Sequence, residues 1–443
     1  MGIRMIMTDK KRSRRARLAL QSGCKPVCAA LTGLAGLAVM AAAPAGAHPH
    51  KDGAHGNHSE THSVTHTRRH DGIGNFVIKS DRIDLQADWR GSFEINMAGD
   101  GFDALDGRFA IKQLKGRKSD SVVFNGDGEV TDVIYAVDDR TRDIGPEEKQ
   151  RIRALLQLFV MESGIDAEQR VAALYGKGGA GVVFDVVEKM LGSHGARKYL
   201  TALAESEQLS GAELSRYAAL TKALDGDHAK SKAIRAVLAH QSDLDEKARA
   251  EMIDVASDLE SDHEIRKILQ AIANDKLSPA TAKVAMTMLM TISSDHEFRK
   301  GAGVILSNRS FSDDQRAAVI RAATDKIDSA HELRKIVAMG GACVQRSKAC
   351  GDASLKAVRA IDSDHEKRKS VSIVSGALPA QSAYWGDLMK AADAIASDHE
   401  KRKALAAIAS HMPHDQKLVT LYKQSAERLS SESERKKALA VVN

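Results

Sequence analysis

Histidines are the residues best suited to chemistry in this 443-residue chain, and seven of its 17 histidines lie in one short segment. They are His48, His50, His55, His58, His62, His66 and His70. Imidazole nitrogens bind Zn²⁺, Ni²⁺, Cu²⁺ and Co²⁺, so this segment is a candidate metal-binding site. The glycines, serines and threonines between the histidines disfavour a helix that would preform such a site. We therefore expect a flexible chelating segment, for which the alternative is a polar, pH-responsive linker.

A second group of histidines belongs to a repeated motif, Ser-Asp-His-Glu-x-Arg-Lys. Its four full copies and two variants cover residues 261–267, 294–300, 363–369, 397–403, 329–335 and 431–437. A His-Glu pair on a helix can belong to a zinc peptidase, but that chemistry requires a second histidine where each copy of this motif has lysine. We expect these histidines to be structural, with partner contact or pH sensing as the alternatives.

Other patterns that could bind a ligand stand in the wrong context. The segment from Gly176 to Gly181 has the spacing G-x-G-x-x-G, but a helical pattern precedes it instead of a strand, which favours a turn between helices. The acidic stretches 100–103 and 125–129 lack the full ligand set of a Ca²⁺ loop and are expected to be turns. Because the sequence has no recognisable nucleophile and base pair, zinc signature or phosphate loop, we do not expect an enzyme.

The first 47 residues are typical of an export signal. A basic stretch from Lys10 to Lys25 precedes an apolar run from Val27 to Ala43, and Ala45-Gly46-Ala47 is a small-residue cleavage site. An uncleaved membrane anchor is the alternative, although the apolar run is short for that role. We expect cleavage after residue 47, no membrane span in the remaining chain, and a periplasmic or secreted protein. The general and the twin-arginine export routes both stay open.

Removal of this leader changes both the charge and the cysteine content of the protein. The whole chain has 65 Lys and Arg against 59 Asp and Glu, whereas residues 48–443 have 57 against 58. The basic excess therefore belongs to the leader and does not indicate a nucleic-acid or anionic-membrane partner. Cys343 and Cys350 remain, and in an oxidising compartment we expect a disulfide between them. Two separate thiols are the alternative.

Short runs of alternating apolar and polar residues predict a small antiparallel β domain at residues 73–144, after a His-rich segment at 48–72. The expected strands cover residues 75–79, 83–89, 92–96, 108–112 and 130–137. Glycine-rich turns at Gly91, 99–101 and 125–128 are expected to separate these strands.

A period of 33 to 35 residues governs the rest of the chain. Measured at the motif histidine, the repeat recurs at residues 194, 228, 263, 296, 331, 365, 399 and 433. Apolar residues lie four positions before this point and, with one glycine as the exception, nine positions after it. Lysine lies four positions after it in every copy. Two helices fit into each period, which predicts an α-solenoid of about eight 34-residue repeats at 192–443, preceded by a helical connector at 145–191.

The motif itself predicts the start of a helix. A serine followed three residues later by glutamate is a capping box, as in Ser261 and Glu264. An aspartate four residues before an arginine, as in Asp262 and Arg266, predicts an ion pair on the surface of one helix. Both interpretations make the motif a device that stabilises its own helix.

The expected fold class is therefore α+β, mainly α. Over residues 146–443 the repeated helices resemble HEAT-like or tetratricopeptide-like helical-repeat proteins, although the tryptophan, glycine, tyrosine and proline markers of the latter are absent. The motif behind a small β domain is also similar to uncharacterised exported bacterial proteins, a resemblance that implies no activity. Because solenoids usually hold another protein or peptide, we expect a non-catalytic exported interaction scaffold. The alternative is a periplasmic divalent-metal-binding or metal-stress protein that uses the His-rich segment.

Overall fold

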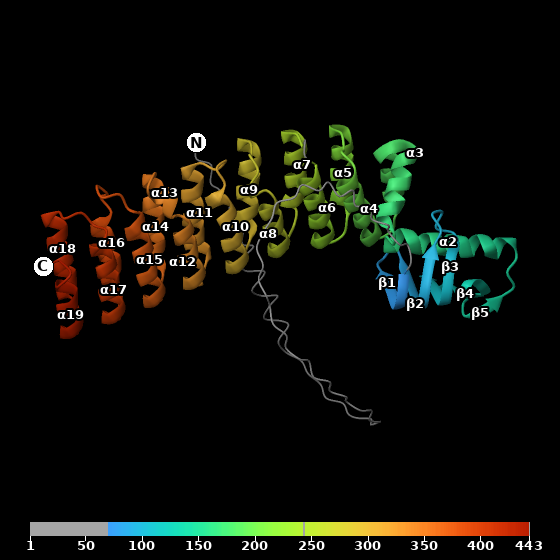
Figure 1. Cartoon of the computed structure of the whole chain (residues 1–443), viewed down its shortest axis with the longest axis horizontal. Coiled ribbons are helices and arrows are strands. Elements are labelled where there is room, and N and C mark those ends of the chain that lie inside the picture. The colour runs from blue at the N-terminus through green and yellow to red at the C-terminus, as the bar shows by residue number, and fades with distance from the viewer. Residues whose placement is uncertain (1–69, 242–243, 443) are drawn as a thin grey trace, which may run out of the picture. The chain divides into compact units, whose positions relative to one another are not determined.

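The computed structural model describes residues 70–241 and 244–442, which form a five-stranded antiparallel sheet followed by eighteen helices (Figure 1). This confirms the expected α+β, mainly α, fold class. Within the described ranges, every helix is too short or too polar to span a bilayer. The leader at 1–47 and the histidines from His48 to His66 lie outside these ranges.

The strands follow one another across the sheet in chain order. They are β1 (His70–Lys79), β2 (Asp84–Ile95), β3 (Phe102–Lys115), β4 (Lys118–Val137) and β5 (Arg140–Arg142). Two of the expected turns are wrong, because Gly91 lies inside β2 and residues 125–128 lie inside β4. Gly91 pairs with Gly107 of β3, which pairs with Gly126 of β4. A Cβ on Gly91 would lie 1.9 Å from the Asp106 carbonyl oxygen, so glycine at this position allows β2 and β3 to pair without interruption.

The first helix, α2 (Pro146–Ser163), belongs to the core of the β domain. Proline at its first position and two acidic residues in its first turn start it, as expected. Its buried side chains, which include Leu155 and Phe159, share one hydrophobic cluster with the sheet. The rings of Phe159 and Phe109 meet edge to face with their centres 5.2 Å apart. The expected connector at 145–191 thus begins with a helix that packs on strands.

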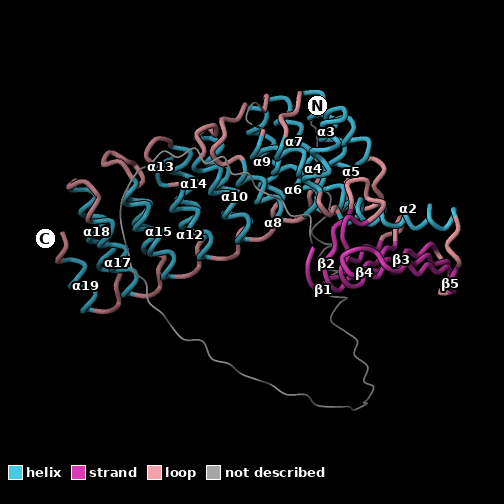
Figure 2. The backbone as a smooth tube through the Cα atoms, turned by 45° about the vertical axis from the view of Figure 1, so that its right-hand side comes forward, coloured by secondary structure: helices cyan, strands magenta, loops and turns pink. Residues whose placement is uncertain are grey.

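The remaining helices form two rows, which run side by side along the chain (Figure 2). The row that carries the repeated motif, here called the motif row, consists of α4 (Ser193–Ser206), α6 (Asp227–His240), α8 (Asp262–Ala271), α10 (Asp295–Ser307), α12 (Ala330–Met339), α15 (Asp364–Ala377), α17 (Asp398–Ala409) and α19 (Glu432–Leu439). The opposite row consists of α3 (Ala167–Val187), α5 (Gly211–Ala223), α7 (Glu246–Ser257), α9 (Pro279–Thr291), α11 (Asp313–Lys326), α14 (Lys348–Ala360), α16 (Trp385–Asp393) and α18 (Gln416–Glu427). The short α13 (Gly341–Val344) lies between α12 and α14. Each helix packs on the next one in its own row, which is a helical-repeat arrangement.

The G-x-G-x-x-G segment lies in α3 and interrupts it. Gly178 and Gly179 have non-helical backbone angles, and Gly179 has a φ of 72°. The segment therefore joins two helical pieces, whereas a dinucleotide-binding turn would directly follow a strand.

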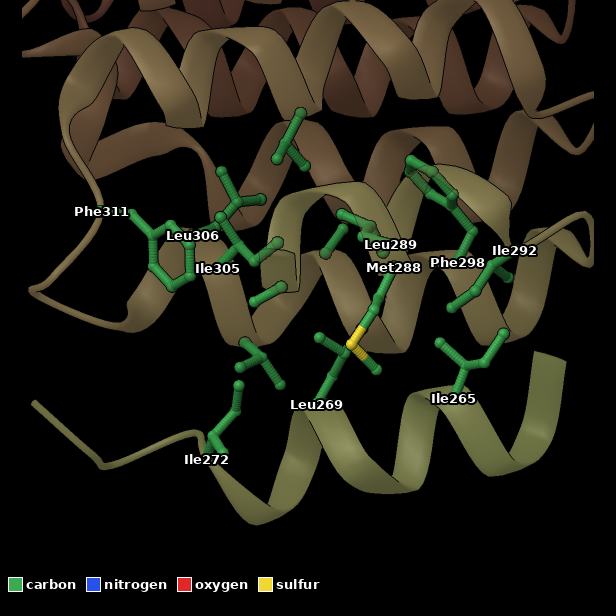
Figure 3. Close-up of a cluster of buried hydrophobic side chains, with 14 of the residues drawn as sticks. Ile265, Leu269, Ile272, Met288, Leu289, Ile292, Phe298, Ile305, Leu306 and Phe311 are labelled. Carbon is green, nitrogen blue, oxygen red and sulfur yellow. The ribbon is translucent and has the colours of Figure 1, made fainter. Parts of the chain in front are cut away.

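The core fills the space between the two rows. Figure 3 shows Ile265, Ile272, Met288, Phe298 and Ile305 from three successive helices pointing into one interior, where each is at most 2% exposed. Ile272 and Ile305 stand nine positions after a motif histidine, so the period identified them as core residues. Truncating one such side chain to alanine would cost about 2–5 kcal/mol.

Candidate functional site: the motif row

The serine of each motif caps its helix as expected. In α8 the Ser261 hydroxyl accepts a hydrogen bond from the backbone N–H of Glu264, and the equivalent serines of α10, α12, α15, α17 and α19 do the same. The second half of the predicted capping box is wrong. Within the described residues, the Glu264 side chain does not return to the serine N–H; it binds His228 of the preceding repeat and Lys267 of its own.

The serine N–H is instead bound by an aspartate of the preceding repeat. Asp262 Oδ2 accepts hydrogen bonds from the N–H of Ser294 at 2.7 Å and from the N–H of Ser293 at 3.0 Å. Four further motif aspartates accept from the next cap serine in this way: Asp227, Asp295, Asp364 and Asp398. The predicted ion pair between Asp262 and Arg266 of the same helix is therefore wrong. We call this set of contacts the aspartate ladder.

The motif arginine also reaches the next repeat. Arg266 Nε donates to Glu297 at 2.6 Å, and Arg299 Nε donates to Glu332 at 2.6 Å. The same pairing joins Arg334 to Glu366, Arg368 to Glu400 and Arg402 to Glu434. Both partners are mostly shielded from solvent, where a charge-assisted bond is stronger than on an open surface. This arginine–glutamate ladder runs beside the aspartate ladder.

Both Glu297 of the ladder and Glu264 of the repeat before it have lowered pKa values. Burial on its own favours the neutral acid of Glu297, but the hydrogen bond and charge of Arg266 outweigh it and lower the pKa. Burial also opposes the ionised form of Glu264, yet hydrogen bonds from its partners lower the pKa to about 2. These carboxylates are therefore ionised at neutral pH.

The motif histidines lie over the same glutamates and remain about half exposed. His228 Nδ1 lies 3.2 Å from Glu264 Oε1, and His365 Nδ1 lies 3.5 Å from Glu400 Oε2. No group of three or more His, Cys, Asp or Glu side chains in the described part of the chain is placed to hold a metal ion. The histidines thus act as partners of the ladder and present one ring edge to solvent.

The outward face of the motif row, on the side away from the opposite row, has a regular chemistry. Lysine lies four positions after each motif histidine and is at least partly exposed in all eight repeats. From α10 onward, small residues occupy the position seven after that histidine, namely Gly303, Ala338, Ser372 and Ala406. The opposite row has exposed ion pairs between neighbouring helices, such as that of Lys356 with Asp325 at 2.8 Å, whereas the motif lysines that form an ion pair do so with the glutamate of their own helix, as Lys335 does with Glu332.

His70 is the one residue of the predicted metal segment that lies in the described part of the chain. It begins β1, where its ring stacks on Phe93 with centres 5.0 Å apart. Its Nε2 atom lies 3.0 Å from Oδ1 of Asp166, whose side chain is 5% exposed. The other six predicted ligands, His48 to His66, lie outside the described residues. His70 is therefore tied to the folded body.

Cys343 and Cys350 are joined by a disulfide in the structure, with their Cα atoms 5.7 Å apart. Both side chains are buried, and the bridge links α13 to the first turn of α14.

Two buried polar residues that sequence reasoning missed join the β domain to the first repeats. The Glu162 carboxylate accepts the N–H groups of Leu191 at 2.7 Å and Gly192 at 2.8 Å, and burial raises the pKa of Glu162. Arg170 donates to the carbonyl oxygens of Asn96 and Met97, each at 3.0 Å. A single charged residue on a helix looks like a solvated one in sequence, so no local signal marked either.

Comparisons with known proteins do not assign the chain to a family. No protein-family model and no curated protein matches the chain. A solved structure described as "Computational Design of Self-Assembling Cyclic Protein Homooligomers" is similar at 15% sequence identity and covers 64% of this chain and 90% of its own, with a TM-score of 0.13. A TM-score this low does not show a shared fold.

Proposed function

We propose that the protein is an exported, non-catalytic scaffold that holds a partner protein or peptide on the outward face of the motif row. The observation that supports this is the contrast between the two rows. The motif row presents small side chains beside one lysine from every repeat, and the lysines that pair do so within their own helix, while exposed charges of the opposite row include pairs between neighbouring helices. A partner could approach the helix backbones closely beside the small residues of the first surface, and on the second it would meet exposed ion pairs that join neighbouring helices.

Site-specific photo-cross-linking in cells that export the full chain tests this proposal. A photoreactive amino acid at Ala338, which is exposed on α12, should give a discrete protein adduct. The matched control is Thr287, which is exposed on α9 of the opposite row and should give none. Adducts of equal yield at both positions, or no adduct at Ala338 and at the equivalent Ala406, would contradict the proposal.

The proposed location, the periplasm or the exterior, is supported by the leader and by the cysteine pair. Amino-terminal sequencing of the protein from the cell envelope or medium should begin at His48. A start at Met1 in a membrane fraction would show that the leader stays attached as an anchor.

A second candidate function is divalent-metal binding, which the seven histidines between His48 and His70 favour. Calorimetric titration of Zn²⁺, Ni²⁺ and Cu²⁺ compares a form that begins at His48 with one that begins at Asp71. Submicromolar binding that is lost with the segment would support this function, and weak or unchanged binding would reduce the segment to a linker. The His70→Ala variant of the longer form should bind as tightly as its parent, because His70 is already held by Asp166.

A further inference from the structure

A cleft of about 500 Å³ crosses the outward face of α4, α6 and α8. Its charged lining is mostly basic: Arg197 from α4, Lys232 and Arg235 from α6, and Lys267 from α8, which pairs with Glu264 of its own helix. One carboxylate, Glu205, also lines it and lies 4.0 Å from the His240 ring nitrogen. The cleft therefore holds more positive than negative charge, whereas residues 48–443 as a whole contain 57 Lys and Arg against 58 Asp and Glu.

Among the described residues the charge of Arg197 has no partner, because the arginine–glutamate ladder breaks at this repeat. Arg197 stands three positions after His194, as Arg266 stands after His263, and each should reach a glutamate one repeat later. For Arg266 that partner is Glu297, but the equivalent position for Arg197 is Ala229. Within the described residues Arg197 consequently makes no ion pair, and burial lowers its pKa without a carboxylate to compensate.

Arg235 adds a second cation that other repeats lack. The position seven after the motif histidine is arginine only in α6, while the later repeats have glutamine or a small residue there. In the described part of the chain, Arg235 Nε is buried without a hydrogen-bond partner, and so is the hydroxyl oxygen of Thr201, which also lines the cleft. Lys232 forms no ion pair with a described carboxylate either. An anion in the cleft would pair with the charges of Arg197, Lys232 and Arg235, none of which has an ion-pair partner among the described residues.

We propose that this cleft binds an extended acidic peptide segment, whose carboxylates pair with Arg197, Arg235 and Lys232. The inference rests on the proposed scaffold function and names the class of its partner. Neighbouring helices of one row lie roughly 8–10 Å apart, so a cleft across three of them is about 16–20 Å long. That length fits about five or six extended residues at roughly 3.3 Å each, whereas a single small oxyanion would occupy only part of it.

The test measures binding of a labelled seven-residue peptide of alternating glutamate and alanine to the full exported protein, by fluorescence anisotropy at low and high salt. The peptide should bind, and its glutamine analogue should not. Arg197→Gln and Arg235→Gln should each weaken binding about tenfold, the loss of one charge-assisted bond. The matched control is Lys403→Gln, which alters the position equivalent to Lys232 in α17, away from the cleft, and should change affinity less than about twofold.

Three results would overturn the assignment: equal binding of the glutamine analogue, unchanged affinity of both arginine variants, or complete displacement by inorganic phosphate at the peptide's own concentration. The last would identify an oxyanion site instead of a peptide site. Circular dichroism on each variant verifies the fold. If the peptide fails to bind while cross-linking at Ala338 still captures a partner, the cleft assignment fails and the scaffold proposal stands. If the peptide binds but no adduct forms at Ala338, the cleft assignment stands and the scaffold proposal fails.

Discussion

A single aspartate of the motif joins two repeats. Asp262 lies in the first turn of α8 and accepts two backbone N–H groups at the start of α10. The first N–H groups of a helix have no partner within the helix, so they require an acceptor from elsewhere. A carboxylate satisfies them better than a neutral group does, because it also interacts favourably with the helix dipole.

Replacing this carboxylate should lower stability more than replacing an exposed one. We expect Asp262→Ala to reduce the free energy of unfolding by about 1.5–3 kcal/mol, the usual contribution of hydrogen bonds to a charged group. Asp262→Asn keeps one acceptor oxygen and should lose less. Urea denaturation measures both against Asp362→Ala, whose side chain is exposed and makes no described contact, and which should stay within about 0.5 kcal/mol of the parent. An equal loss at both aspartates would show that the ladder contributes nothing.

Glu264, which pairs with His228 and Lys267, predicts how stability depends on pH. Glu264 has a pKa of about 2 in the folded protein against an ordinary value of 4.5. A group with a depressed folded pKa contributes stability that is fully present above its unfolded pKa and is lost as the pH falls toward its folded pKa. Urea midpoints should therefore decline between about pH 4.5 and pH 2. In Glu264→Gln this decline should be shallower, whereas a parallel decline in both proteins would show that Glu264 is not responsible.

At the scale of elements, the approach of α4 to α2 depends on one glycine. A Cβ on Gly195 would lie 1.9 Å from the carbonyl oxygen of Met161, so the two helices could not keep their spacing. We expect Gly195→Ala to destabilise the protein by about 1–3 kcal/mol or more in thermal denaturation. Gly176→Ala is the control, because a Cβ there meets nothing within 4 Å, and it should be neutral or stabilising by up to about 1 kcal/mol. Similar effects of both variants would refute the close contact.

The disulfide is the other element-scale device. The two cysteines are seven positions apart in the sequence, so the bridge closes a short loop between α13 and α14. Loop-closure entropy for so short a loop corresponds to about 2–3 kcal/mol. The double variant Cys343→Ser with Cys350→Ser should lose about that much stability under oxidising conditions, measured by urea denaturation. Under reducing conditions the parent should fall to the level of the variant, and a parent that does not respond to reductant would contradict a stabilising bridge.

For the whole molecule, the ladders make the repeat the unit of construction. From α8 onward each repeat contacts the next through its motif arginine, and every such repeat except that of α12, which has Ala330 in place of the aspartate, also does so through its motif aspartate. A complete repeat should therefore be removable. After deletion of residues 294–328, Ser329 takes the place of Ser294 as the partner of Asp262. Glu332 likewise takes the place of Glu297 as the partner of Arg266. We expect a folded protein with unchanged helicity per residue and one unfolding transition in circular dichroism.

The control deletion removes residues 294–310 and hence α10 without its partner from the opposite row. This would place two helices of the opposite row in succession and expose the core between the rows. It should lower helicity and promote aggregation, which light scattering detects. If both deletions fold equally well, the repeat is not the structural unit.

Some of the structure was predictable because its causes are local in sequence. Helix starts at Ser261 and Ser294 follow from the capping serine, and the burial of Ile272 and Ile305 follows from their fixed distance to the motif histidine. The same local reasoning placed turns at Gly91 and residues 125–128, where cross-strand pairing in fact continues the strands. Glycine has a tertiary role there, namely room for a neighbouring backbone.

The sequence by itself determined the period, the two helices of each repeat and the core positions, because these depend on spacing along one chain. Only the tertiary structure decided the partners of the charged motif residues. Asp262 and Arg266 can meet on one helix, yet each binds a group one repeat away. Asp262 accepts from backbone N–H groups that have no partner within their own helix, and Arg266 pairs with the shielded carboxylate of Glu297. The basic cleft has the same origin. Ala229 is an ordinary helix residue in sequence, and only the stacking of α4 on α6 shows that it leaves Arg197 without a partner in the described part of the chain.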